Sequence, residues 1–277
     1  MHRIELSPLR WLRVATAGAL AASTLASVAF AQAPSEPAAC SARSGAQTVA
    51  LAELYTSEGC SSCPPADVWL SSLAKQGLGL DKVVPLGLHV DYWDYIGWKD
   101  EFATATITER QRDWAKSHRA RFVYTPQVVL AGQDYRAWSD GGIVPDVKRV
   151  NATPARASLS LNAMPTKNTI AVTGSVNVPN VAERGDTKIY LALSQNSIAT
   201  PVKRGENAGA TLKHDHVVRE WIGPLQLGAD GKLELDRRLT LPKSAKPGDL
   251  RLTLIAQRGG EVLQVLALPL QGAACGA

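Results

Sequence analysis

The sequence lacks any cluster of basic residues with aromatic residues interleaved, the pattern typical of nucleic-acid-binding proteins. Its formal net charge is only +5, from 30 Lys and Arg against 25 Asp and Glu, so we expect no nucleic acid partner. Beyond the N-terminal segment it has no apolar run long enough to cross a bilayer. It also has only 4 cysteines, which makes the position of each one informative.

The one long apolar run, Val14–Phe30, lies near the N-terminus and follows three arginines. Ala29-Phe30-Ala31 is a small-x-small cleavage site, so we expect a signal peptide over residues 1–31. The protein would then be secreted or periplasmic, with no membrane attachment after cleavage and a net charge of about +3, since cleavage removes three Arg and one Glu. A membrane anchor is the alternative, although the run is rich in small residues and short for a span.

Two of the cysteines, Cys60 and Cys63, stand three residues apart between a predicted strand and a predicted helix. The apolar run Thr48–Tyr55 precedes them, and Ala66–Lys75 follows with apolar residues at roughly helical spacing. This arrangement is typical of a redox motif of the thioredoxin kind. We expect Cys60 at the helix N-terminus, where free N–H groups favour the reactive thiolate by about 0.3–1 kcal/mol. A structural disulfide and a zinc half-site are the alternatives, but zinc normally needs a second CxxC or a histidine pair.

The other two cysteines, Cys40 and Cys275, lie near the two ends of the exported chain. Four cysteines permit three pairings, and the CxxC spacing favours Cys60–Cys63 together with Cys40–Cys275. Disulfides persist outside the cytoplasm. We therefore interpret Cys40–Cys275 as a structural bond that contributes at most about 5 kcal/mol to the free energy of unfolding. Two unpaired tail thiols are the alternative.

The composition divides the exported chain into three parts. Residues 32–46 are small and polar and predict a linker. In residues 47–152, strand-like and helix-like runs alternate, which predicts an α/β domain. From residue 153 to 277 short alternating runs are separated by turns, which predicts an antiparallel β-sandwich domain without a second catalytic motif. The predicted strands of this last part are Ala157–Asn162, Thr169–Val178, Thr187–Ser194, His216–Trp221, Lys232–Leu241, Leu250–Arg258 and Val262–Leu270.

A further predicted strand, Phe122–Gly132, has a proline near its start. Proline is disfavoured in a central strand, so Pro126 belongs at the beginning of the strand or at a sheet edge. The order of strand, CxxC, helix, strand, helix, Thr125-Pro126 and strand pair resembles the thioredoxin fold. The sequence thus predicts a thioredoxin-like domain followed by a β-sandwich.

Five stretches resemble one family more closely: Glu53–Asp67, His89–Asp94, Gly97–Asp100, Tyr124–Gln127 and Gly205–Arg219. On these residues the chain is similar to the exported DUF1223 family of uncharacterised thioredoxin-like proteins. The first four stretches lie in the predicted α/β domain and the fifth in the predicted sandwich, so the resemblance covers both.

The resemblance implies roles for individual residues. Cys60 would be the attacking thiol and Cys63 the resolving one. Pro126 would form a cis peptide bond with Thr125 and offer backbone to an extended substrate; an ordinary trans proline is the alternative. Thioredoxins carry a buried acid about six residues before the first cysteine, and Glu53 is the candidate for this proton acceptor. A surface glutamate is the alternative for Glu53.

The segment from His89 to Asp100 is rich in aromatic residues and follows the end of a predicted strand, where α/β proteins bind ligands. We interpret His89, Asp91 and Trp93, together with Thr125, as the wall of a substrate groove near the cysteines. Packing of this loop onto the following helix is the alternative. We expect the neighbouring Glu58 to lie in solvent.

Two further histidines, His214 and His216, would share one face if they lay on a strand, which permits a metal site. The alternative, which we favour, is a polar turn that docks against the first domain and holds no metal.

The sequence therefore predicts an exported thiol–disulfide oxidoreductase. The Cys60 thiolate would attack a substrate sulfur, and Cys63 would resolve the mixed disulfide. Its partners would be protein or small-molecule thiols and disulfides, and we expect no cofactor. One alternative is a Cu(I) carrier using Cys60, Cys63 and His89, because soft thiolates select that ion. The other is a non-catalytic interaction module in which the CxxC is a fixed disulfide.

Overall fold

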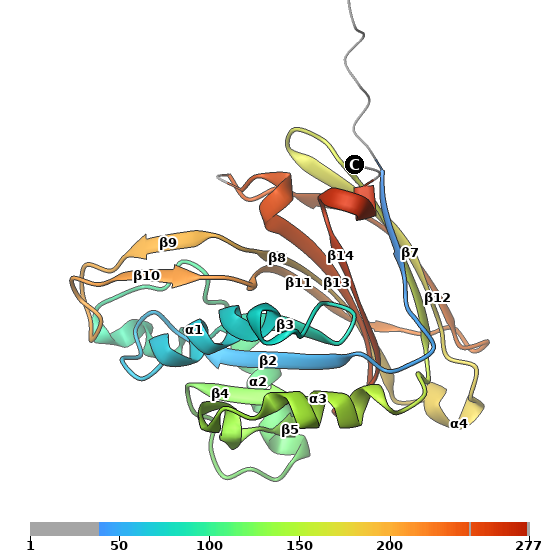
Figure 1. Ribbon diagram of the computed structural model, residues 1–277, viewed down its shortest axis with the longest axis horizontal. Helices are drawn as coiled ribbons and strands as arrows, with labels where there is room; N and C mark the ends of the chain where they lie inside the picture. The colour runs from blue at the N-terminus through green and yellow to red at the C-terminus, as the bar shows by residue number, and fades with distance from the viewer. Residues whose placement is uncertain (1–38, 244, 276–277) are drawn as a thin grey trace, which may run out of the picture. The chain divides into compact units, whose positions relative to one another are not determined.

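A mixed eight-stranded sheet runs through the protein (Figure 1). In spatial order its strands are β14 (Glu261–Pro269), β13 (Leu250–Arg258), β8 (Thr187–Gln195), β11 (Val217–Gln226), β3 (Val83–His89), β2 (Ala50–Thr56), β4 (Gln127–Leu130) and β5 (Gln133–Asp134). The computed structural model describes residues 39–243 and 245–275. The predicted signal peptide and residues 32–38 of the predicted linker lie outside the described residues.

A second sheet of four antiparallel strands has the order β1-β6-β7-β12. Its strands are β1 (Cys40–Arg43), β6 (Ser158–Pro165), β7 (Thr169–Asn177) and β12 (Lys232–Thr240), and a separate hairpin is formed by β9 (Ile198–Pro201) and β10 (Thr211–His214). All seven strands predicted from the alternation after residue 153 are present. β1 corrects the predicted linker: these residues form a strand because they pair with β6 and bury Cys40.

Three helices cover the part of the large sheet formed by β2 to β5. They are α1 (Pro64–Ser72), α2 (Ala105–Ser117) and α3 (Ile143–Asn151). β2 and β3 are parallel, whereas β4 is antiparallel to β2 and β5 to β4. Side chains alternate between the faces of a strand. Ala52 and Leu54 of β2 therefore pack with α1 and α3, and Leu51 and Tyr55 pack on the opposite face with α2.

Shorter helical segments connect these elements. They are η1 (Leu73–Gln76), η2 (Asp91–Ile96), η3 (Arg136–Asp140), α4 (Val181–Arg184), η4 (Pro247–Asp249) and η5 (Gly272–Cys275). The segment η2 contains Tyr92, Trp93 and Tyr95 of the aromatic segment that follows β3, and it leads through a loop with Trp98 to α2.

The large sheet crosses residue 153, where the sequence predicts a domain boundary. β3 and β11 meet at one parallel pair, Gly87 and Val217, and the Gly87 amide donates to the His216 carbonyl over 2.8 Å. All described residues belong to one compact unit. The strands before and after residue 153 thus form one continuous sheet, and the division into two domains stays a prediction.

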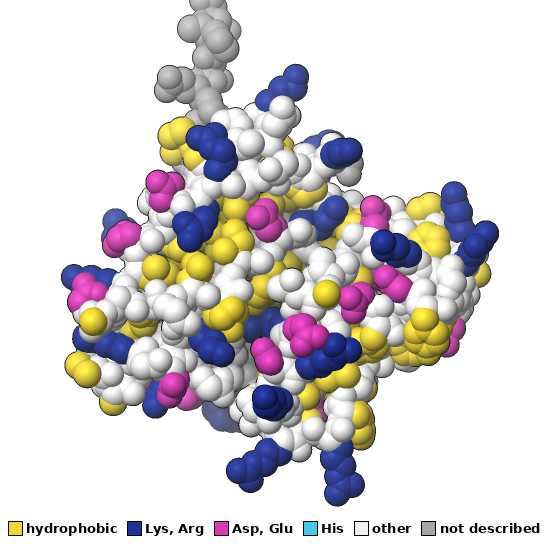
Figure 2. All heavy atoms as spheres, turned by 180° about the vertical axis from the view of Figure 1, so that it is seen from behind, with side chains coloured by type: hydrophobic (Ala, Val, Ile, Leu, Met, Phe, Trp, Pro, Cys, Tyr) yellow, Lys and Arg dark blue, Asp and Glu magenta, His cyan; other side chains and the backbone are white. Residues whose placement is uncertain are grey.

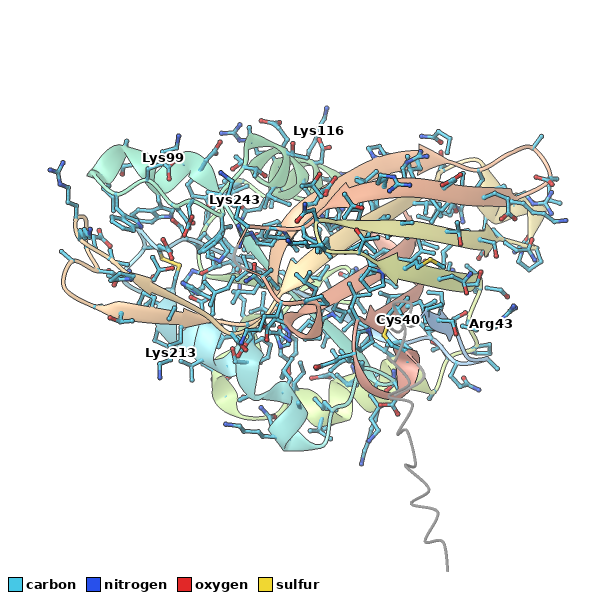
Figure 3. All side chains as sticks on the ribbon, turned by 90° about the horizontal axis from the view of Figure 1, so that it is seen from above. Cys40, Arg43, Lys99, Lys116, Lys213 and Lys243 are labelled. Atoms are coloured by element: carbon cyan, nitrogen blue, oxygen red, sulfur yellow. A yellow bond between two sulfur atoms is a disulfide. The ribbon has the colours of Figure 1, made fainter. Side chains whose placement is uncertain are left out.

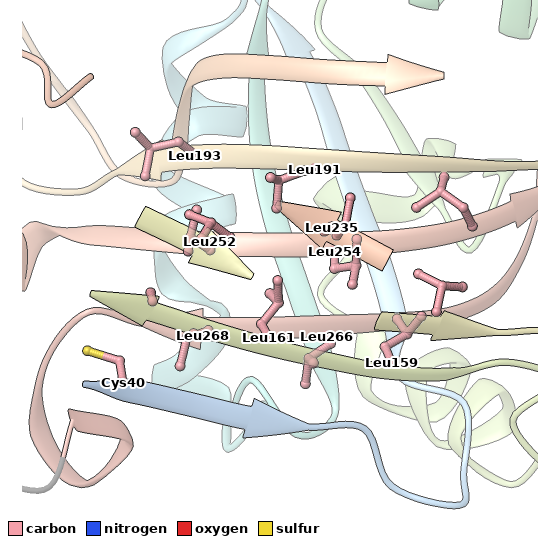
Figure 4. Close-up of a cluster of buried hydrophobic side chains, with 14 of the residues drawn as sticks. Cys40, Leu159, Leu161, Leu191, Leu193, Leu235, Leu252, Leu254, Leu266 and Leu268 are labelled. Atoms are coloured by element: carbon pink, nitrogen blue, oxygen red, sulfur yellow. The ribbon is translucent and has the colours of Figure 1, made fainter. Parts of the chain in front are cut away.

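The two sheets share a large hydrophobic core. Side chains of β6, β7 and β12 meet those of β8, β13 and β14, and Figure 4 shows the leucines of this cluster, among them Leu161, Leu191 and Leu252, together with Cys40. Cys40 forms a disulfide with Cys275 of η5, and both residues are buried. In Figure 3, Cys40 lies toward one end of the described part, and Lys213 of β10 lies toward the other.

No helix within residues 39–243 and 245–275 combines the length and the hydrophobicity needed to cross a bilayer. The rear face of the protein has acidic and basic side chains interspersed with apolar ones (Figure 2). Two disulfides are present, which suggests an oxidising compartment.

Candidate functional site

The loop between β2 and α1 contains the second disulfide, which joins Cys60 to Cys63. Ser61 and Ser62 between them are exposed, but both cysteines have 0% of their surface accessible. The Ser62 Oγ lies 3.4 Å from the Cys60 Sγ. The disulfide therefore lies just beneath the surface, with a hydroxyl group beside the sulfur of the first cysteine.

The helix begins at Pro64, so Cys60 lies before it rather than at its N-terminus. Cys63 is the N-cap of α1, and Cys60 precedes it by one turn in which the Cys63 amide donates to the Cys60 carbonyl over 3.2 Å. Pro64 and Pro65 occupy the first helical positions, as is common for proline, and have no N–H group to offer. The placement of Cys60 at the helix N-terminus was wrong, and the helix end offers a thiolate fewer N–H donors than the usual first turn.

The Thr125–Pro126 peptide bond is cis, and Pro126 directly precedes β4. Because Gln127 pairs with Tyr55 of β2, the proline lies at the end of β2 from which the cysteine loop departs. Trp93 connects the two segments. Its Nε1 donates to the Thr125 Oγ1 over 2.7 Å. On its other side Trp93 lies close to Gly59, where a side chain would not fit easily, because a Cβ atom added to this glycine would lie 3.2 Å from the Trp93 Cβ.

The structure does not bring Glu53 together with the cysteines. Glu53 is buried on the face of β2 that packs against α2, whereas Cys63 caps α1 on the other face. Its Oε1 pairs with the Arg110 Nη2 at 2.7 Å. The Arg110 guanidinium in turn lies 4.8 Å and 4.4 Å from the ring centroids of Tyr190 and Trp221. A carboxylate neutralised in this way is a poor candidate for the predicted proton acceptor.

A buried cluster of ionisable side chains lies beneath the cysteine loop instead. Its members are Glu58, Asp67, His89, Asp100 and His214. The His214 Nε2 lies 3.2 Å from the Glu58 Oε1, and its Nδ1 lies 3.9 Å from the Asp67 Oδ2, beyond hydrogen-bond distance. The His214 Nδ1 is buried without a hydrogen-bond partner among the described residues. Glu58 corrects our expectation of a solvated side chain, because His214 and Trp98 pair with its two oxygens.

The electrostatics of this cluster are set by burial and by one ion pair. Burial raises the pKa of Asp67. Burial alone would lower the pKa of His89, but the charge and hydrogen bond of Asp100 raise it above its usual value. Burial would raise the pKa of Asp100. The contact with His89 and the hydrogen bonds from the backbone N–H groups of Glu58 and Phe102 outweigh burial and lower this pKa. His89 Nδ1 lies 2.7 Å from Asp100 Oδ2, so each group favours the charged form of the other.

This pair predicts a pH dependence of stability. In the unfolded chain a histidine titrates near about pH 6.5, and the folded protein holds the His89 proton more tightly. The stabilisation is therefore complete below about pH 6.5 and is lost as the pH rises through the raised pKa. We expect His89→Gln to lower the free energy of unfolding by about 3 kcal/mol at low pH and to flatten this decline.

Urea denaturation at several pH values measures both effects. The matched control is His118→Gln, because the His118 ring stacks on Trp114 and makes no ion pair among the described residues. Equal pH profiles for His89→Gln and the unsubstituted protein would show that the His89–Asp100 pair does not titrate as described.

Asp91 does not lie where the sequence predicts, and the two later histidines do not form the shared strand face that a metal site would need. The Asp91 Oδ1 accepts a hydrogen bond from Thr108 of α2 over 2.6 Å, so Asp91 fastens η2 to α2 rather than facing a substrate groove. His216 lies in the turn after β10, where its Nδ1 is 3.2 Å from Arg251. His214 and His216 therefore share no strand face. The described residues contain no group of three or more His, Cys, Asp or Glu side chains placed to hold a metal ion.

The loop of the β9–β10 hairpin reaches the cysteine loop from a distant part of the sequence. The Ser61 amide donates to the Glu206 Oε2 over 3.0 Å. The Asn207 Nδ2 donates to the carbonyls of Glu58 and Cys60 over 2.8 and 3.0 Å. The sequence predicts a polar turn in this stretch that docks against the first domain, but it assigns no role to Glu206 or Asp67. For Asp67 a signal exists, because it stands four residues after Cys63 on a helix.

A cavity of about 980 Å³ lies elsewhere in the described part of the protein. Its wall is formed by α2, β8, β11 and the turn after β13, with Arg110, Tyr190 and Trp221 among its residues. Neither cysteine contributes to it. We place the candidate site at the cysteine loop because the reactive groups and the buried acids are there, and cavity volume alone identifies no chemistry.

Comparisons with known proteins place the chain as follows. A family model described as a protein of unknown function (DUF1223) matches residues 51–257. No significant match is found among curated proteins. A crystal structure of an Agrobacterium tumefaciens protein shares 24% identity at a TM-score of 0.56 and covers 83% of this chain and 98% of its own. HBP35 of Porphyromonas gingivalis shares 12% identity at a TM-score of 0.60, and the match covers 81% of this chain and 76% of that protein. At these identities the likeness concerns the fold alone.

Proposed function

The chain belongs to the DUF1223 family, and we propose that it is a thiol–disulfide oxidoreductase whose reactive group is the Cys60–Cys63 pair. The observation on which the proposal rests most is the placement of this disulfide at the junction of β2 and α1, at the same end of β2 as the cis Thr125–Pro126 bond. The export that the sequence predicts fits this chemistry, since an oxidising compartment allows disulfides to form.

The topology supports a thioredoxin-like assignment for the first part of the chain. β2, α1, β3, α2, β4, β5 and α3 follow one another, and the four strands lie in the order β3-β2-β4-β5 with β4 antiparallel to β2. We assign the later strands to a β-sandwich on the basis of the core that the two sheets share.

The proposed reaction transfers two electrons between the cysteine pair and a substrate. In the reduced protein the Cys60 thiolate attacks one sulfur of a substrate disulfide, the substrate S–S bond breaks, and one substrate thiolate leaves. The Cys63 thiolate then attacks the Cys60 sulfur, the mixed disulfide breaks, and the second substrate thiolate leaves. Cys60 and Cys63 are thereby oxidised to the disulfide and the substrate is reduced to two thiols. The reverse sequence oxidises a substrate dithiol.

We assign the proton acceptor for Cys63 to Asp67. Its amide donates to the Cys63 carbonyl over 3.2 Å, and side chains four residues apart lie on the same face of a helix. Burial raises the pKa of Asp67, which favours transfer of the thiol proton to this carboxylate. The Thr56 Oγ1 donates to the Asp67 Oδ2 over 3.3 Å and orients it.

The full burial of both cysteines supports a second candidate function, a non-catalytic interaction module with a fixed disulfide. Incubation with reduced glutathione distinguishes the two, with alkylation and mass spectrometry to report each cysteine. We expect reduction of Cys60–Cys63 through a glutathione adduct on Cys60, while Cys40–Cys275 stays oxidised. A Cys60–Cys63 bond as resistant as Cys40–Cys275 would favour the fixed disulfide.

A further inference from the structure

A hairpin from a distant part of the sequence covers the cysteine loop. We call residues 198–214, which comprise β9, β10 and the loop between them, the covering hairpin. β10 contacts α1, and Figure 1 shows the two strands running alongside that helix. The tip of the hairpin binds three backbone groups of the cysteine loop through Glu206 and Asn207: the Ser61 amide and the carbonyls of Glu58 and Cys60.

We propose that the covering hairpin is a gate: its tip must lift from the cysteine loop before a thiol or disulfide can reach Cys60, and Glu206 and Asn207 hold it closed. This proposal rests on the proposed function in one respect, namely that the gate controls the access of a substrate to Cys60. Two observations support the gate: both cysteines are inaccessible while the flanking Ser61 and Ser62 are exposed, and the tip is hydrogen-bonded to the backbone of the same loop.

The tip is attached in a way that allows it to move as a unit. β9 and β10 pair only with each other and not with the eight-stranded sheet. Two backbone hydrogen bonds join the two ends of the loop between these strands. The Val202 amide donates to the Ala210 carbonyl and the Gly209 amide donates to the Val202 carbonyl, both over 2.9 Å. The base of the hairpin is anchored differently, because His214 is buried against Glu58. Lifting of the tip would part Gly205 from Ile96 and Trp98, which lie close to it, and would leave the base in place.

The closed tip opposes the chemistry in two ways. Asn207 holds the Cys60 carbonyl, so the backbone of the attacked residue is fixed. Glu206 places a carboxylate on the amide of Ser61, the residue next to Cys60. An approaching substrate thiolate has the same sign of charge as this carboxylate and is repelled by it. Opening removes the steric cover and this repulsion together.

The rate at which dithiothreitol reduces Cys60–Cys63 tests the gate. Asn207→Ala removes two hydrogen bonds of the tip, and we expect it to raise this rate about tenfold. Glu206→Gln keeps an acceptor for the Ser61 amide but removes the charge, and we expect it to raise the rate about threefold. Salt screens the Glu206 charge in the unsubstituted protein, so we expect the difference between the two proteins to shrink as the salt concentration rises. Lys203→Arg is the matched control, because it changes an exposed residue of the same loop and keeps its charge, and we expect an unchanged rate.

Hydrogen exchange of the Ser61 amide gives a second readout that needs no redox chemistry. Faster exchange in Asn207→Ala, with Lys203→Arg unchanged, would support the gate. Equal reduction and exchange rates in Asn207→Ala and the unsubstituted protein would overturn it, and so would an equal acceleration by Lys203→Arg, which would indicate general loosening. If Asn207→Ala accelerates both processes but the pair has the low potential of a structural disulfide, the gate stands and the proposed oxidoreductase function fails.

Discussion

A Cys63→Ser variant should accumulate a mixed disulfide between Cys60 and a substrate thiol, and Cys60→Ser should form none. In the intact protein Cys63 is held beside Cys60 and resolves the adduct as an intramolecular reaction. Well-oriented intramolecular reactions have effective molarities of about 10⁵ M or more, so loss of Cys63 should prolong the life of the adduct by at least about a thousandfold. Mass spectrometry after exposure to oxidised glutathione detects and locates the adduct.

The matched control for this experiment is Ser62→Ala. It retains both cysteines but removes the hydroxyl that lies 3.4 Å from the Cys60 sulfur, so we expect exchange to slow by less than about tenfold. A Cys63→Ser protein that is folded, retains the Cys40–Cys275 bond and forms no adduct at Cys60 would contradict the assignment of Cys60 as the attacking thiol.

Removal of the other disulfide should have the largest effect on stability. Cys40–Cys275 closes a loop with a sequence separation of 235, for which the chain-entropy model gives a loss of up to about 5 kcal/mol in the free energy of unfolding. Both residues belong to the core shared by the two sheets, so their replacement by Ser also places hydroxyl groups in an apolar cluster. Denaturant unfolding of the Cys40→Ser, Cys275→Ser double variant measures the loss.

This double variant should keep the reactivity of Cys60–Cys63, because Cys40 lies toward the opposite end of the described part from the covering hairpin (Figure 3). Ser41→Ala is the control, since it changes an exposed residue of the same strand. A double variant that unfolds at the same denaturant concentration as the unsubstituted protein would show that the bond does not stabilise the fold.

Much of the strand pattern could be predicted because it follows from local alternation. Several of the predicted strands after residue 153, such as β6 and β7, have apolar residues at every second position, and the cysteine motif is bounded by a strand-like and a helix-like run. The short strand β1 could not be predicted in this way. It has four residues, among them a serine and an arginine, and it is ordered by pairing with β6 more than a hundred residues later.

The failures at the site have the same origin, since they depend on contacts between distant residues. Distance along the sequence suggested Glu53, but the alternation of side chains along β2 points it away from α1 toward Arg110. Glu58 looked like a solvated loop residue, and only the contact with His214 buries it. The contacts of Glu206 and Asn207 with the cysteine loop span about 150 positions and have no local signature.

The reduction potential of the Cys60–Cys63 pair, measured by equilibration in glutathione buffers, tests the central claim most directly. The account predicts half-reduction between about −270 and −120 mV, the range of thiol–disulfide exchange proteins, with Cys40–Cys275 oxidised throughout. A Cys60–Cys63 bond that stays oxidised below about −300 mV would contradict the account and identify the pair as a structural disulfide.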